Sequence, residues 1–120
     1  MPIIIDEEKV ENGQDAVILH LKGELDTYSS PEFLEEFNKK IEEGVKNFVI
    51  DLSGVSFVSS SGWGALSYAL KKSREHMGDL VLCNMSGQVK RVYKIMGFRA
   101  VLKSFDDLDE AVKFILRKEK

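Results

Sequence analysis

Two short and almost wholly apolar segments, 48–52 and 80–83, constrain the fold of this chain more than any other feature. They read Phe-Val-Ile-Asp-Leu and Leu-Val-Leu-Cys, and such runs are typical of strands covered on both faces, as in parallel sheets. Between them, apolar residues recur at helical spacing within 62–77: Trp63, Leu66, Ala69 and Leu70. A strand, a helix and a strand in this order predict a βαβ crossover and a parallel pair.

The N-terminal third predicts two strands and a helix. Residues 3–9 indicate an edge strand, and residues 15–22 a second strand with alternating apolar positions. The turn Asn12-Gly13 between them favours an antiparallel hairpin. Ser30-Pro31-Glu32 then predicts a helix start with Ser30 as cap, and Gly44 ends that helix.

The C-terminal part continues the alternation. We expect a helix over 86–96 that stops at Gly97, a short strand near 100–103 and a last helix over 107–116. Residues 1–120 then form one α/β domain with a mixed central sheet of about four to five strands and about four flanking helices. Functional sites in such sheets gather beyond the carboxyl ends of the strands.

The segment 53–63, which reads Ser-Gly-Val-Ser-Phe-Val-Ser-Ser-Ser-Gly-Trp, follows the first apolar strand. Its three consecutive serines therefore lie at a strand-to-helix junction, where backbone N–H groups lack helical partners and the helix dipole favours negative charge. A hydroxyl there can cap the helix, and Ser60 or Ser61 would suffice. It can equally receive a phosphoryl group.

The sequence lacks the residues that several other classes of function require. A Gly-x-Ser-x-Gly hydrolase elbow centred on Ser60 has Val58 at its first glycine position, and His76 is at the far end of the following helix. Gly62-Trp63-Gly64 has no following Lys-Ser or Lys-Thr of a nucleotide loop. We therefore expect neither a catalytic serine nor a cofactor, and His20 and His76 receive no role.

Composition narrows the partners and the compartment. The net charge of −3 argues against nucleic acid, and we interpret the basic residues of 90–94 as a solvated helix face. One cysteine, Cys83, in an apolar run indicates a buried thiol, and two distant histidines exclude an ordinary zinc site. The start of the chain lacks a signal peptide's apolar region, and no segment is long enough to span a bilayer, so we expect a soluble, cytoplasmic protein.

The segment 50–64 resembles the signature of the STAS domain, and more narrowly that of the bacterial anti-sigma factor antagonists. The family's loop runs roughly Asp-Leu-Ser-x-Val-x-Phe-x-Asp-Ser-Ser-Gly-Leu-Gly, and most of these positions match here. The likeness extends to Gly-Glu-Leu-Asp at 23–26, to Ser-Gly-Gln-Val-Lys-Arg-Val at 86–92 and to Met-Gly-Phe at 96–98. The predicted order of strands and helices also fits the family.

The resemblance implies a regulatory protein and not an enzyme. In the antagonists, the first serine after the aspartate is phosphorylated by a partner that is both serine kinase and anti-sigma factor. Carried over through Gly62, that acceptor is Ser60, with Ser59 in the aspartate's place and Trp63 in the leucine's. The implied contact surface comprises Asp26, Ser59, Ser60, Ser61, Gly62 and Trp63. A serine phosphatase is a further implied partner, and no metal is implied.

Two alternatives stay open. The loss of the aspartate at Ser59 motivates a second hypothesis, a constitutive STAS adaptor in a larger assembly, such as a lipid-transport or stress-sensing complex, without a phosphorylation switch. Trp63 begins the predicted helix, so its indole belongs either to the core or, if exposed beside the serines, to an interface as an anchor.

Overall fold

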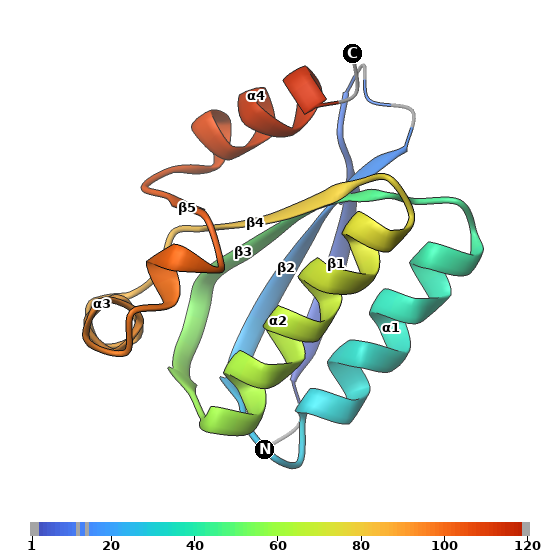
Figure 1. Ribbon diagram of the computed structural model, residues 1–120. Helices are drawn as coiled ribbons and strands as arrows, with labels where there is room; N and C mark the ends of the chain where they lie inside the picture. Colours follow the sequence, from blue (N-terminus) through green and yellow to red (C-terminus); the bar gives the residue numbers. More distant parts are fainter. Residues whose placement is uncertain (1–2, 12, 14, 119–120) are drawn as a thin grey trace.

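The computed structural model of the chain describes residues 3–11, 13 and 15–118. It contains one five-stranded sheet in the order β1-β2-β3-β4-β5 (Figure 1). The strands are β1 (Ile4–Lys9), β2 (Ala16–Leu25), β3 (Asn47–Val58), β4 (Asp79–Cys83) and β5 (Ser104–Phe105). The helices are α1 (Ser30–Glu42), α2 (Ser60–Glu75), α3 (Gly87–Ile95) and α4 (Leu108–Lys118), with a 3₁₀ turn η1 (Phe98–Ala100).

The topology confirms the predicted α/β class. β1 and β2 pair antiparallel, and every later neighbouring pair of strands is parallel. Helices connect the parallel strands, so the predicted hairpin is followed by alternating helices and strands. Asn12, on which the predicted turn partly rests, lies outside the described residues.

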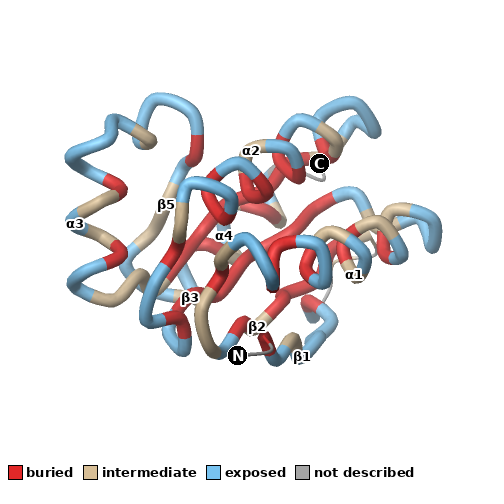
Figure 2. The backbone as a smooth tube through the Cα atoms, turned by 90° about the horizontal axis from the view of Figure 1, so that it is seen from below, coloured by how far each residue is buried: buried red, intermediate tan, exposed pale blue. Residues whose placement is uncertain are grey.

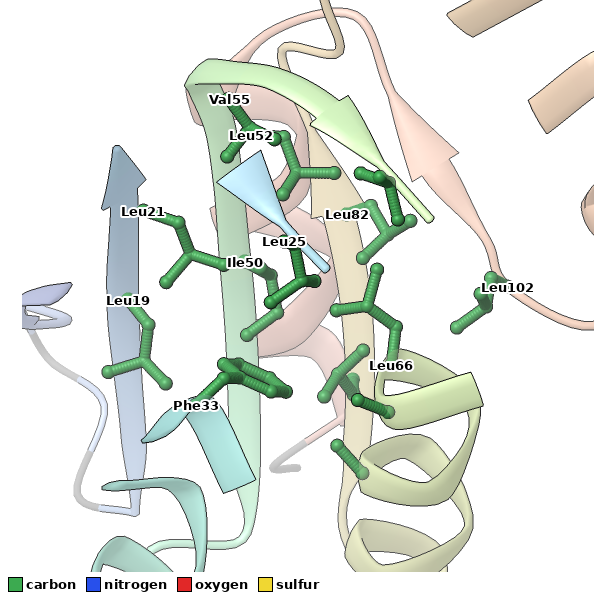
Figure 3. Close-up of a cluster of buried hydrophobic side chains, with 14 of the residues drawn as sticks. Leu19, Leu21, Leu25, Phe33, Ile50, Leu52, Val55, Leu66, Leu82 and Leu102 are labelled. Carbon is green, nitrogen blue, oxygen red and sulfur yellow. The ribbon is translucent and has the colours of Figure 1, made fainter. Parts of the chain in front are cut away.

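Helices cover both faces of the sheet (Figure 1). α1 and α2 lie side by side on one face, and their apolar side chains meet those of the strands. Figure 3 shows this cluster, in which Phe33 of α1 and Leu66 of α2 point among Ile50 and leucines of the strands. α4 covers the opposite face over Val49, Val81 and Cys83. The burial colours of Figure 2 follow this layering, with the central strands β2, β3 and β4 largely buried and the outer helix surfaces exposed.

Besides the extension of β2 from the predicted residue 22 to Leu25, three differences from the sequence prediction have identifiable causes. β3 runs to Val58, beyond the predicted end at Leu52, because its second half continues to pair with β2 across two register shifts. β5 lies at Ser104–Phe105, since residues 98–100 form the turn η1 in place of the predicted strand. Apolar periodicity in a sequence reveals neither a register shift between strands nor a strand of only two residues.

The cap of α1 is the third difference. Ser29, not Ser30, is the N-cap, and Ser30 is the first helical residue. The chain already turns at Asp26, whose carbonyl accepts the Ser30 N–H at 2.9 Å. Because of this turn, the helix starts one residue closer to the N-terminus than predicted. The Ser30 hydroxyl is buried and finds no partner within the described residues.

The long strands β2 and β3 determine where the serine segment lies. Their last residues, Leu25 and Val58, are opposite one another in the parallel ladder. Both strands end beyond β4, whose last residue pairs with Asp51. The loop after β2 and the junction after β3 therefore emerge together at the carboxyl edge of the sheet, where sites of α/β proteins gather.

Candidate functional site

Ser59 is the residue that caps α2. Its backbone is extended, with φ −81° and ψ 175°, and its hydroxyl accepts the N–H of Gly62 at 3.1 Å. Its own N–H donates to the Leu25 carbonyl at 2.9 Å, which ties the junction to the end of β2. The capping function that the sequence left to Ser60 or Ser61 thus belongs to Ser59, so the other two hydroxyls are not needed for the cap.

Ser60 and Ser61 begin the helix, and both are exposed. The Ser61 hydroxyl lies 3.1 Å from that of Thr27, in the loop after β2. The Ser60 hydroxyl has no hydrogen-bond partner within the described residues. The first turn of α2 contains no acidic side chain, so the positive end of the helix dipole is not neutralised there. Ser60 therefore combines an unengaged hydroxyl with a local field that favours an anion.

Asp26 holds the neighbouring loop in shape. Its carboxylate accepts the N–H groups of Tyr28 at 2.9 Å and Ser29 at 3.0 Å. Hydrogen bonds hold the pKa of Asp26 below its usual range, because they outweigh the opposing effect of desolvation. The largest contribution comes from the Ser29 N–H, and the Tyr28 N–H and the Ser29 hydroxyl add to it. The loop that contains Asp26 reaches the serines through Thr27 and presents Tyr28 with 86% of its surface exposed.

Gly62 and Trp63 are buried, in contrast to the three serines. A Cβ at Gly62 would lie 2.3 Å from the Leu25 carbonyl oxygen, so only glycine allows this close approach of α2 to β2. The Trp63 indole is 3% exposed and stacks on Phe98, with ring centroids 4.7 Å apart. Of the two alternatives for Trp63, the structure favours the core, and we leave both residues out of the contact surface proposed below.

The other candidate groups lie away from the serines. His76 is the C-cap of α2, about 24 Å along the helix axis from Ser60 at 1.5 Å per residue. Cys83 is buried, as predicted, and burial, followed by the charges of Asp51 and Asp107, raises its pKa to about 12. Within the described ranges, no group of His, Cys, Asp and Glu could hold a metal ion, and no helix has the length and apolarity of a membrane span.

His20 joins a polar network across the sheet that the sequence pattern did not reveal. Its Nδ1 lies 2.6 Å from Asp51 Oδ2 on β3, and its Nε2 lies 2.8 Å from Glu8 Oε1 on β1. The other Asp51 oxygen accepts the Ser53 N–H and the Asn84 amide. Burial lowers the pKa of His20, but the hydrogen bonds and charges of Asp51 and Glu8 outweigh it and raise that pKa overall. The imidazolium form, in which both nitrogens donate, therefore fits the site.

This network predicts a pH dependence of stability. Because the pKa of folded His20 lies above 6.5, the folded chain binds this proton more tightly than the unfolded chain does. The contribution is fully present below pH 6.5 and is lost as the pH rises through the folded pKa. We expect urea midpoints of the wild type to fall over that window and those of His20→Gln to stay flatter. His76→Gln, at an exposed position, is the control; an unchanged slope in His20→Gln would contradict the assignment.

Some residues of the site and its surroundings could not be found from the sequence. Thr27 and Tyr28 lie in a turn, where apolar periodicity carries no information, and only their place directly after Asp26 marked them. His20 and Asp51 are paired by the register of two parallel strands, which a single sequence does not specify.

Known proteins resemble this chain in sequence and in fold. The model of the STAS domain family matches residues 8–111. The anti-sigma-B factor antagonist of Listeria monocytogenes is 30% identical over 93 residues, which span 77% of this chain and 81% of that protein.

Solved structures share the fold. The phosphorylated form of the Bacillus cell fate determinant SpoIIAA superposes with a TM-score of 0.69 at 20% identity, over 93% of this chain and 99% of that one. The murine anion transporter Slc26a9 matches 86% of this chain with only 18% of its own length, at a TM-score of 0.73 and 22% identity. At these identities the likeness shows the fold alone. Together with the family match over nearly the whole chain, the comparisons place this protein in the STAS domain family.

Proposed function

We propose that the chain is an anti-sigma factor antagonist of the bacterial cytoplasm. In this proposal its unphosphorylated form binds an anti-sigma factor with serine kinase activity and frees the sigma factor. Transfer of a phosphoryl group to Ser60 ends that binding, and a serine phosphatase restores it. The chain itself is a non-enzymatic regulator and the substrate of its partner.

The availability of the Ser60 hydroxyl carries the proposal. Of the three serines, Ser59 is engaged in the cap and Ser61 lies against Thr27, whereas Ser60 is exposed and unengaged. A kinase needs such a hydroxyl, because the Oγ must approach the γ-phosphorus in line as the bond to the β-phosphate oxygen breaks. The Listeria relative, named an anti-sigma-B factor antagonist, supports the same class of function.

The surroundings of Ser60 suit a switch that acts on the partner more than on the fold. A phosphate adds about −1.5 to −2 charges and three acceptor oxygens. The N-terminus of α2 tolerates an anion, so the chain need not rearrange. The partner would have to desolvate that charge in its own interface. We assign the direct contact to Asp26, Ser59, Ser60 and Ser61, with exposed Tyr28 as an aromatic anchor beside them.

A phosphorylation assay tests the acceptor. The purified chain, incubated with MgATP and the ATP-binding anti-sigma factor encoded in the same genome, is expected to gain the mass of one phosphoryl group. Ser60→Ala should abolish this uptake. Ser61→Ala removes the adjacent exposed hydroxyl and should retain it. Uptake that survives in Ser60→Ala and disappears in Ser61→Ala would move the acceptor to Ser61, and no uptake by the wild type would remove the switch.

A constitutive STAS adaptor is the second candidate function. The observation that favours it is Ser59, which stands where the family usually has aspartate and whose neutral hydroxyl is used by the cap. An adaptor of this kind would bind its assembly equally well as wild type and as Ser60→Asp. Affinity for a purified partner that is indifferent to Ser60→Asp would therefore favour the adaptor over the switch.

A further inference from the structure

We infer that the exposed face of α2 and the groove at its C-terminal half form a second part of the partner interface, which accepts an acidic amphipathic helix of the anti-sigma factor. The inference rests on the proposed function and extends it from the serine junction along the helix.

The position follows from helical spacing. Residues four or three apart share one face of a helix, and the series that starts at Ser60 runs along exposed or half-exposed positions of α2: Ser60, Gly64, Ser67, Lys71 and Arg74. At 1.5 Å per residue this stripe is about 21 Å long. A partner that contacts Ser60 therefore meets a continuous surface that leads away from the serines.

No contact among the described residues requires a glycine at position 64. It is exposed in the interior of α2, and a Cβ built there meets no atom within 4 Å. Glycine in a helix interior costs about 0.5–1 kcal/mol relative to alanine. Gly62 two residues earlier is required by its contact with β2, but Gly64 only keeps the stripe flat. A flat stretch of helix surface beside Ser60 allows another backbone to approach closely.

The stripe leads into a groove between α2 and the chain that follows η1. Its volume is about 510 Å³, and its apolar lining comes from Leu70 and Val101, of which Val101 is 52% exposed. The lining residues are Ser67, Leu70, Lys71, Arg74, Glu75 and Val101. The lining residues come from a helix and from the chain after a turn, and none of them belongs to a strand. The groove therefore offers no strand to extend, and an amphipathic helix, which satisfies its own backbone hydrogen bonds, suits it.

Charge determines which helix fits. Two cations and one carboxylate line the groove. Arg74 approaches Asp79 at 3.5 Å, whereas Lys71 has no ion-pair partner in the described part of the chain. The two cations beside Leu70 and Val101 are complementary to a helix with apolar anchors and acidic flanks.

Two exposed aliphatic residues provide a matched test. Val101→Asp places a carboxylate in the groove, whereas Ile4→Asp makes the same change on β1 at a residue of similar exposure, 55% against 52%. With the purified anti-sigma factor in a titration calorimeter, we expect Val101→Asp to bind at least about tenfold more weakly and Ile4→Asp to stay within about twofold of the wild type. Thermal unfolding of both variants verifies that they are folded.

Gly64→Leu tests the flat stripe in the same assay. It should weaken binding by at least about tenfold, because the new side chain occupies the space of the partner. Gly87→Leu is the control, since Gly87 is also exposed and also has no atom within 4 Å of a built Cβ. Lys71→Glu should weaken binding most at low salt, as expected for a lost charge complement.

The outcomes separate this inference from the proposed function. If Ser60→Asp abolishes binding while Val101→Asp and Gly64→Leu bind like the wild type, the groove inference is wrong and the switch stands. If the wild type does not bind the anti-sigma factor, both are wrong. If Val101→Asp dissociates a homodimer of the chain but leaves the affinity for the anti-sigma factor unchanged, the groove binds a second copy of the chain. That result also overturns the inference.

Discussion

Phosphorylation of Ser60 is expected to weaken binding to the anti-sigma factor by about 100-fold or more, which corresponds to roughly 3 kcal/mol. The modified hydroxyl lies exposed at the start of α2, within the proposed contact surface. In the free chain water and the helix N-terminus solvate the new charge, but in the complex the partner must replace that water. Calorimetry with the wild type before and after phosphorylation measures the difference.

Two variants of Ser60 separate the effect of a negative charge from the effect of losing the hydroxyl. Ser60→Ala removes a hydroxyl that has no partner within the described residues, so its affinity should remain within about threefold of the wild type. Ser60→Asp adds one negative charge and should lose most of the affinity. Equal binding by the alanine and aspartate variants would show that charge at this position does not control the complex.

Gly62→Ala and Gly64→Ala are expected to change stability in opposite directions. A Cβ added at Gly62 would lie 2.3 Å from the Leu25 carbonyl oxygen and 2.8 Å from a methyl of Val58, neither of which is the end of a flexible side chain. We expect Gly62→Ala to lower the free energy of unfolding by about 3 kcal/mol or more, because backbone must move to admit the methyl group.

Gly64→Ala is the matched control in the same helix. Its new methyl group makes no contact within 4 Å, and alanine replaces the poorer helix former, so we expect a gain of about 0.5–1 kcal/mol. Urea unfolding of both variants measures the two values. A Gly62→Ala variant as stable as the wild type would contradict the close packing of α2 on the end of β2. A destabilised Gly64→Ala variant would contradict the open surface at that position.

Much of the fold could be predicted because its elements have strong local signals. The apolar run 48–52 is covered on both faces, and the helices over 62–77 and 86–96 have apolar stripes that periodicity detects. The extension of β3 to Val58 could not be predicted, because it arises from the ladder with β2, which local preference does not encode. The one-residue shift of the α1 cap arises from the local turn at Asp26, which apolar periodicity does not detect.

The candidate site divides in the same way. The position of the three serines at a strand-to-helix junction followed from the sequence, since a buried strand preceded them and a helical pattern followed. Which serine caps the helix depended on the φ and ψ of Ser59 and on its distance from the Gly62 N–H. The burial of Trp63 depended on Phe98, a residue of a distant turn. Such choices among neighbouring serines and between core and surface need tertiary contacts.

A competition measurement tests the central claim most directly. A preformed complex of the anti-sigma factor and its sigma factor is mixed with the chain, either unmodified or phosphorylated at Ser60, and resolved by size exclusion. We expect the unmodified chain to release free sigma factor and the phosphorylated chain to leave the complex intact. Release by both forms, or by neither, would contradict the switch.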